Sequence, residues 1–216
     1  MLQSLKIVPG ESDRVLALAI DDVLKGHIRV DGTHDDALLE DYATAAVEWY
    51  EDAADRSLIT ATWEARFDCF PGQVGDARRG PRWERAADRY AIFLPKSPAV
   101  AVTSVKYLDG DHVEQTIDAA DYALDAEAEP ATIVPALGKT WPAVASDRPG
   151  AVRVRFTAGY GTTADDVPHK IQQCLRLLVA HWYDPARGPV VTGTIVAELP
   201  FALRSLFWST RAQRAA

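Results

Sequence analysis

The chain has 216 residues, of which 48% are hydrophobic and 25% charged, values that are ordinary for a globular protein. Its formal net charge of −8 at pH 7 argues against a DNA-binding protein, because nucleic-acid affinity comes mainly from neutralising phosphates. The N-terminus lacks the apolar segment of a signal peptide, and the apolar run at 15–20 is too short to span a bilayer, so we predict a soluble cytoplasmic protein.

The first helix is predicted over residues 18–28, where Ile20, Val23, Leu24 and Ile28 recur at helical spacing. Two acidic residues stand near its start, where the helix dipole favours negative charge. The chain is then predicted to turn before the next helix begins.

A second, longer helix is predicted over residues 35–56, with an apolar stripe on one side and acidic residues on the other. The stripe comprises Leu38, Leu39, Tyr42, Ala46, Trp49 and Ala53. The predicted outer face comprises Asp36, Glu40, Asp41, Glu48, Glu51, Asp52 and Asp55. Three interpretations of this face stay open: a solvated surface, an acid/base or cation site, and the lining of a channel through which DNA slides.

Over residues 59–69 apolar and polar residues alternate one by one, which predicts a half-buried strand. Asp109-Gly110 is typical of a hairpin turn between two later strand-like runs. These later runs lie at 90–94, 102–108, 113–117, 122–124, 131–134 and 152–157. We therefore predict a small antiparallel β-domain.

Residues 71–88 are rich in Gly, Pro and Arg, which predicts a long loop. Its arginines are either solvated or form salt bridges to an acidic neighbouring subunit. The candidates for this inter-subunit contact are Arg78, Arg79, Arg82 and Arg85. Acidic residues interspersed among them weaken a nucleic-acid interpretation.

Pro168 is predicted to open another helix, capped by Asp165 or Asp166, that ends at Asp184 because Pro185 follows. A short terminal helix is predicted within residues 201–214. The fold class is therefore α+β, a helical frame with an inserted small antiparallel β-domain. Its predicted parts are an N-terminal helical part at 1–57, the β-domain at 58–161, a helix completing the frame at 162–185 and a connector with the C-terminal segment at 186–216.

The sequence contains no recognisable catalytic motif: G-x-S-x-G, H-E-x-x-H, C-x-x-C and the P-loop are all missing. The histidines lack metal-ligand spacing. Gly159-Tyr160-Gly161 lacks the third glycine of a dinucleotide fingerprint and is predicted to be a simple turn. Cys69 and Cys174 are predicted to be buried free thiols, with one disulfide as the alternative. We predict no enzyme, no cofactor and no metal.

Phe207 and Trp208 place a large apolar area near the end of the chain. Each ring can bury about 150–250 Å², which at about 25 cal/mol per Å² amounts to up to about 10 kcal/mol for the pair before ordering costs. The C-terminal segment is therefore either docked on its own domain or held by a partner.

Short segments spread over most of the chain, taken together in their order and spacing, carry a family resemblance. They are LKGHIRVD at 24–31, the acidic helix at 35–56, LITATWE at 58–64, VTSVKYLD at 102–109, VRVRFTAGYG at 152–161, LVAHWY at 178–183 and GTIVAELP at 193–200. With these segments the chain resembles the head–tail connector (adaptor) family of long-tailed phages and gene transfer agents.

The resemblance implies a structural protein of the particle neck, a homo-oligomeric ring of about a dozen copies. The ring would sit beneath the capsid portal protein, with a tail-side stopper protein on its other face. DNA would pass through the central channel as a non-specifically contacted chain, and assembly would take place in the bacterial cytoplasm without a membrane. The C-terminal segment would contact the portal through Leu203, Arg204, Leu206, Phe207, Trp208 and Arg211, and the acidic helix would line the channel through Glu40, Asp41, Glu48 and Glu51.

Two other interpretations remain. The first is a small-molecule or carbohydrate-binding β-sandwich module with Trp63, Trp83 and Trp141 as stacking platforms, although Trp63 lies on the apolar side of its strand and favours a core position. The second is an enzyme whose site is dispersed along the chain.

Overall fold

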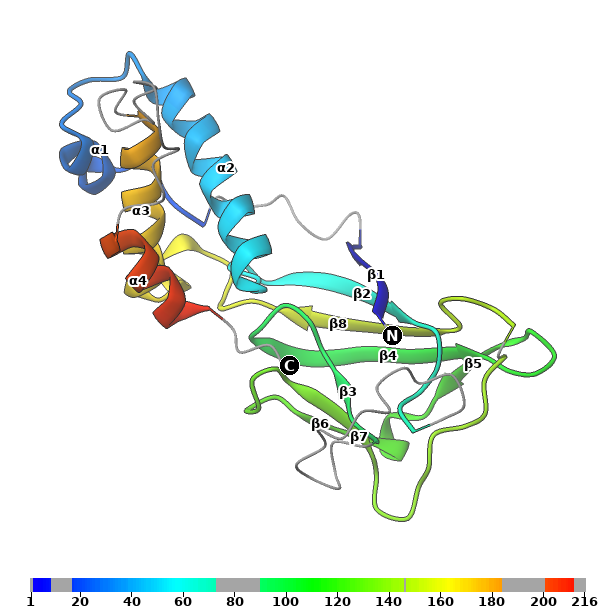
Figure 1. Ribbon diagram of the computed structural model, residues 1–216. Coiled ribbons are helices and arrows are strands. Elements are labelled where there is room, and N and C mark those ends of the chain that lie inside the picture. Colours follow the sequence, from blue (N-terminus) through cyan, green and yellow to red (C-terminus); the bar gives the residue numbers. More distant parts are fainter. Residues whose placement is uncertain (1, 9–16, 73–89, 146, 184–200, 212–216) are drawn as a thin grey trace, which may run out of the picture. The chain divides into compact units, whose positions relative to one another are not determined.

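The computed structural model describes residues 2–8, 17–72, 90–145, 147–183 and 201–211, which are drawn in colour in Figure 1. These residues form two compact units. The β unit comprises residues 2–8, 60–72, 90–145 and 147–159, and the helical unit comprises residues 17–59, 160–183 and 201–211. The predicted α+β fold class is thereby confirmed, with the β part inserted between two stretches of the helical part.

Four α-helices and one 3-10 turn lie in the described part of the helical unit: α1 (Asp22–Ile28), α2 (Asp36–Ala54), η3 (Ala164–Asp166), α3 (His169–Tyr183) and α4 (Phe201–Thr210). Asp21 caps α1, since its carboxylate accepts a hydrogen bond of 2.8 Å from the backbone of Leu24. Both α1 and α2 end at left-handed residues, Arg29 (φ 60°) and Asp55 (φ 56°), whose N–H groups bond back to the preceding turn. Helix α3 is described to Tyr183, and its predicted end at Asp184 lies outside the described residues.

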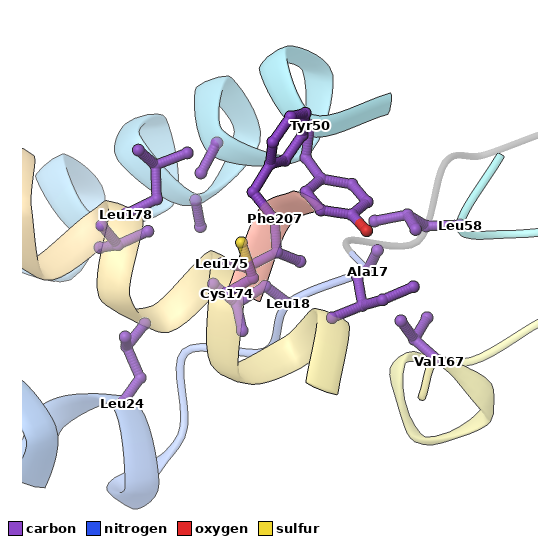
Figure 2. Packing of buried hydrophobic residues seen from close by; sticks show 14 of the residues in the cluster. Ala17, Leu18, Leu24, Tyr50, Leu58, Val167, Cys174, Leu175, Leu178 and Phe207 are labelled. Carbon is purple, nitrogen blue, oxygen red and sulfur yellow. The ribbon is translucent and has the colours of Figure 1, made fainter. Parts of the chain in front are cut away.

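The helices bury one shared apolar core. Leu24 of α1, Tyr50 of α2, and Leu175 and Leu178 of α3 are all fully buried in it (Figure 2), as is Leu39 of α2. Burial raises the pKa of Tyr50 to about 12, so its hydroxyl stays neutral at physiological pH. This core fixes which face of α2 can reach solvent.

The buried stripe of α2 is rotated from the predicted one. Leu38 is 44% exposed, and the fully buried positions are Leu39, Ala43, Ala46, Tyr50 and Ala54. Small alanine side chains allow the backbones of neighbouring helices to approach closely, so they occupy the centre of the contact although they add little to a hydrophobic pattern. The larger Tyr42 and Trp49 pack at the margin of the core, half-buried.

The β unit contains a five-stranded antiparallel sheet of order β1-β2-β8-β4-β5 and a three-stranded antiparallel sheet of order β3-β7-β6 (Figure 1). The strands of the larger sheet are β1 (Leu2–Ile7), β2 (Ala61–Phe67), β8 (Val152–Ala158), β4 (Ala99–Leu108) and β5 (Glu114–Ile117). The strands of the smaller sheet are β3 (Ile92–Phe93), β7 (Thr132–Pro135) and β6 (Tyr122–Asp125), the last preceded by the 3-10 turn η2 (Ala119–Asp121). The predicted turn at Asp109-Gly110 does join β4 to β5.

The two sheets share a second apolar core. Trp63 of β2, Phe156 of β8 and Ile133 of β7 are buried in it, and the ring of Phe70 stacks on Trp141 at 4.8 Å. The indole N–H of Trp141 donates to a backbone carbonyl at 2.7 Å. Trp63 and Trp141 are therefore core residues and not exposed stacking platforms, which removes two of the three groups on which the carbohydrate-binding interpretation depended. Trp83 lies outside the described residues.

Strand β1 was not predicted: residues 2–7 were assigned to the helical part, whereas they pair with β2 as an edge strand. A register shift between Leu2 and Ser4 interrupts the two-residue alternation, so the segment shows no clean period. The two cysteines, Cys69 in the β unit and Cys174 in α3, are buried free thiols, as predicted. Burial raises the pKa of Cys174 to about 11, which keeps its thiol protonated.

Gly159 and Tyr160, predicted to be part of a simple turn, form a bend after β8, and Gly161 pairs with Ile59 in an isolated parallel bridge before η3. Asp166 bonds the backbone N–H and the hydroxyl of Thr163, each at 2.9 Å, and completes the capping box of η3. Its carboxylate packs so closely on Gly161 that a Cβ there would overlap it. Asp165 and Asp166 thus belong to η3 and do not cap α3 directly, because this extra turn precedes the helix.

Candidate interaction surfaces

The C-terminal helix α4 is docked on its own unit. Leu203 and Phe207, one helical turn apart, are buried in the helical core, with Phe207 8% exposed. Figure 2 shows Phe207 beside Tyr50. The Phe207 ring centroid lies 5.3 Å from that of Trp49 and 5.8 Å from that of Tyr50. These two members of the predicted portal contact therefore hold α4 in place in the isolated chain.

The buried guanidinium of Arg56 reinforces this docking. Its Nε donates to the carbonyl oxygen of Thr210 at 2.5 Å, and one of its terminal nitrogens donates to the Tyr160 hydroxyl at 2.8 Å. A positive group at the C-terminal end of a helix satisfies carbonyls that have no intrahelical partner and interacts favourably with the helix dipole. The sequence analysis assigned no role to Arg56, because the carbonyl that it binds belongs to a residue 154 positions further along the chain.

The opposite side of α4 carries the other members of the predicted contact. Trp208 is 57% exposed and Arg204 is exposed, while Leu206 and Arg211 are half-buried. The guanidinium of Arg211 lies 5.1 Å from the centre of the Trp208 ring, a cation–π arrangement that orients the indole. Trp and Arg are both enriched among the residues that contribute most of the binding energy in protein–protein contacts.

The acidic face of α2, defined here as Glu40, Asp41 and Glu48, is exposed. Within the described residues no ion pair or side-chain hydrogen bond involves these three carboxylates. They stay a predicted channel lining.

Glu51 does not belong to this face, contrary to expectation. It is 6% exposed, and its carboxylate accepts a hydrogen bond of 2.8 Å from the backbone N–H of Leu58. The chain turns back after α2 and leaves this N–H without a backbone partner inside the core, so a carboxylate supplies the acceptor. Glu51 is a structural residue of the turn.

A cationic surface that the sequence analysis missed covers one face of the five-stranded sheet. We define the cationic sheet face as Lys6 of β1, Arg66 of β2, Lys106 of β4, and Arg153 and Arg155 of β8. Their side chains are 35–55% exposed. The strand register brings them together, because Arg66 and Lys106 lie on either side of Arg153 in adjacent strands.

Two carboxylates anchor the cationic sheet face. Glu64 is within 3.6 Å of Lys6 and 3.1 Å of both Arg66 and Arg155, and Glu114 is 2.9 Å from Lys106 and 2.5 Å from Arg153. Burial alone would raise the pKa of Glu64, but the hydrogen bonds from Arg155 and Arg66 and the charge of Lys6 hold that pKa below its usual value. The Lys106 hydrogen bond and the charge of Arg153 likewise lower the pKa of Glu114.

The candidates for the inter-subunit contact, Arg78, Arg79, Arg82 and Arg85, lie outside the described residues. No cluster of three or more His, Cys, Asp or Glu side chains suited to a metal ion occurs among the residues that the structure describes. Over the same residues, the helices are all too short or too polar to cross a membrane.

The fold is that of proteins found in the necks of gene transfer agent (GTA) particles. A chain in the neck of an empty GTA particle, computed with C6 symmetry, has a TM-score of 0.66 at 22% identity. Chains in the virion of a native GTA particle and in the neck of a native GTA particle, computed with C12 symmetry, have TM-scores of 0.65 and 0.62, each at 24% identity. In all three cases the alignment covers 99% of this chain and 98% of the other.

The sequence matches no protein-family model and no curated protein. At these identities the likeness establishes the fold over the whole length of the chain. It agrees with the head–tail connector resemblance of the sequence segments.

Proposed function

We propose that the chain is a head–tail connector (adaptor) subunit, a structural component of the neck of a phage-like particle. The observation that carries this proposal is the likeness to chains of GTA necks along the full length, including both units. Two of those particle necks were computed with sixfold and twelvefold symmetry, which supports a closed ring of about a dozen copies here.

In this role the ring lies between the capsid portal and the tail-side stopper protein, and DNA passes through its channel. The outer side of α4 supplies the portal contact through Arg204, Trp208 and Arg211. Leu203 and Phe207 support this contact from behind, because they fix α4 on the helical core. Contacts repeated around a ring act together, so a weak contact for each subunit becomes a tight joint.

The ring is tested by light scattering of the purified chain, alone and mixed with its cognate portal protein. We expect a particle of about twelve times the 23.6 kDa chain mass, either free or assembled on the portal. A chain that stays monomeric in the presence of the portal would contradict the proposed function.

The portal contact is tested with point variants and not by deleting the C-terminal segment, because deletion would also remove Leu203 and Phe207 from the core. Trp208→Ala with Arg211→Ala should leave the fold intact and abolish portal attachment. Leu137→Ala, which truncates a fully exposed apolar side chain of the β unit, is the matched control and should attach normally. Normal attachment of the Trp208/Arg211 variant would remove α4 from the portal contact.

A further inference from the structure

We propose that the cationic sheet face of one copy binds the acidic face of α2 of the next copy, and that this electrostatic contact is one of the interfaces that close the ring. The inference rests on the proposed function, since it names a contact between neighbouring subunits. It assigns a role to Lys6, Arg66, Lys106, Arg153 and Arg155, which neither the sequence resemblance nor the portal contact uses.

The first argument is the separation of charge along the chain. Residues 17–59 contain eleven acidic and three basic side chains, so this stretch alone carries −8, the net charge of the whole chain. The remaining residues are balanced overall, yet the cationic sheet face gathers five cations around the two carboxylates of Glu64 and Glu114. One chain therefore presents two exposed surfaces of opposite sign, in different units.

The second argument concerns the partner. A closed ring of identical subunits needs two different, mutually complementary surfaces on each copy. The cationic sheet face and the acidic face of α2 meet this requirement. Fixed polar groups of opposite sign also suppress wrong pairings, because like-charged faces repel each other.

The third argument concerns the arrangement of the arginines. Glu64 and Glu114 hold Arg66, Arg153 and Arg155 in place within the sheet, and each side chain keeps an exposed fraction of 35–45%. A guanidinium has five N–H donors in a planar fork, so one that is bound to an internal carboxylate can still bind an incoming carboxylate in the same plane. The carboxylates of Glu64 and Glu114 within this face disfavour binding of a densely charged polyphosphate, because its negative charges would have to approach theirs.

This inference and the channel-lining prediction assign different surroundings to Glu40, Asp41 and Glu48. In one case the neighbouring subunit covers these carboxylates, and in the other they face the channel. Charge reversal separates the two cases, because it disrupts assembly in the first and makes DNA adhere to an intact ring in the second.

The test uses two charge-reversed full-length chains. The acid-reversed chain carries Glu40→Lys, Asp41→Lys and Glu48→Lys, at exposed positions without described side-chain partners. The base-reversed chain carries Lys6→Glu and Lys106→Glu. It is expected to fold, because Glu64 keeps both of its arginines and Glu114 keeps Arg153.

Each reversed chain alone should assemble about tenfold or more weakly than the wild type, since several attractive pairs become repulsive at once. An equimolar mixture of the two should assemble again, because alternating copies restore opposite charges at every interface. A control chain with Asp111→Lys, Glu127→Lys and Asp165→Lys, three exposed acids elsewhere, should assemble like the wild type. Assembly is measured by light scattering, alone and on the portal.

Recovery in the mixture is the result that a general loss of stability would not produce. Wild-type assembly of the acid-reversed chain would overturn the inference while leaving the ring and the proposed function intact. Normal assembly of the base-reversed chain with weakened binding of duplex DNA would also overturn it, and would identify the cationic sheet face as a nucleic-acid surface. A wild-type chain that stays monomeric on the portal would overturn the proposed function and this inference together.

Discussion

Replacing Phe207 with alanine should detach or loosen α4, and the structure sets the size of the effect. A buried Phe→Ala change costs about 3–5 kcal/mol, and Phe207 is 8% exposed with Trp49 and Tyr50 rings against it. Because α4 is a terminal helix, the chain can avoid part of this cost by releasing the helix. The loss is therefore limited to the free energy that docks α4, and we expect about 3 kcal/mol.

The assay is chemical denaturation followed by far-ultraviolet circular dichroism, which reports mainly on helices. All α-helices among the described residues belong to the helical unit, so the signal isolates that unit. Hydrogen exchange of the α4 amides gives a second, local readout. Trp208→Ala is the matched control, because it removes an aromatic ring from the exposed side of the same helix and should change stability by less than about 0.5 kcal/mol.

The two substitutions are therefore expected to affect different properties of the chain. Phe207→Ala lowers stability and protection of α4, whereas Trp208→Ala leaves both unchanged and affects attachment to the portal. Equal stability of the two variants, with equal protection of the α4 amides, would refute the docking of α4 on its own unit. It would return the C-terminal segment to the alternative in which a partner holds it.

Three further changes test the local structure by denaturation or hydrogen exchange, and a fourth tests its pH dependence. Gly161→Ala should destabilise the helical unit, because the new methyl group would overlap the Asp166 carboxylate; unchanged stability would contradict this packing. Arg56→Met should increase hydrogen exchange at the end of α4, because it removes the shorter of two hydrogen bonds to the Thr210 carbonyl and leaves only the Tyr50 hydroxyl at 3.4 Å; unaltered exchange would refute that role. Asp21→Ala should cost about 1 kcal/mol through the lost cap of α1, and no loss would mean that the cap is dispensable. Because the folded state lowers the pKa of Glu64, its carboxylate stabilises the fold at pH values above its ordinary pKa of 4.5, and this stabilisation is lost as the pH falls through the lowered pKa. Glu64→Gln should therefore flatten the acid side of the curve of β-unit stability against pH, and an unchanged curve would contradict this.

Secondary structure was predictable in segments where the apolar residues follow one clear period. The alternation at 59–69 predicted β2, and the apolar spacing after Pro168 predicted α3. Local chemistry alone determines such elements, because one face of each must be buried. The β1 strand escaped prediction because its bulge breaks the period within six residues.

The exposed and buried sides of α2 were less predictable, for a different physical reason. A hydrophobic pattern weights large side chains, whereas the contact with the neighbouring helices is centred on small ones such as Ala43, Ala46 and Ala54. Glu51 shows the same limit for polar residues: its burial follows from the need of one backbone N–H, which appears only when the following turn is in place. Which of these side chains are buried depends on the tertiary structure, and the hydrophobic period of the helix alone does not reveal it.

The net charge was the least informative feature about binding surfaces. A total of −8 describes the field at a distance from the molecule, but a partner in contact meets one face at a time. Arg66, Lys106 and Arg153 come from three separate segments, and the strand register alone makes them neighbours. If faces of opposite sign join successive copies, assembly must weaken as salt increases, since screening shortens the reach of exposed charges from about 8 Å at physiological ionic strength to about 3 Å at 1 M. The apolar contacts that dock α4 gain nothing from low salt, so the ring should come apart into folded subunits and not into unfolded chains.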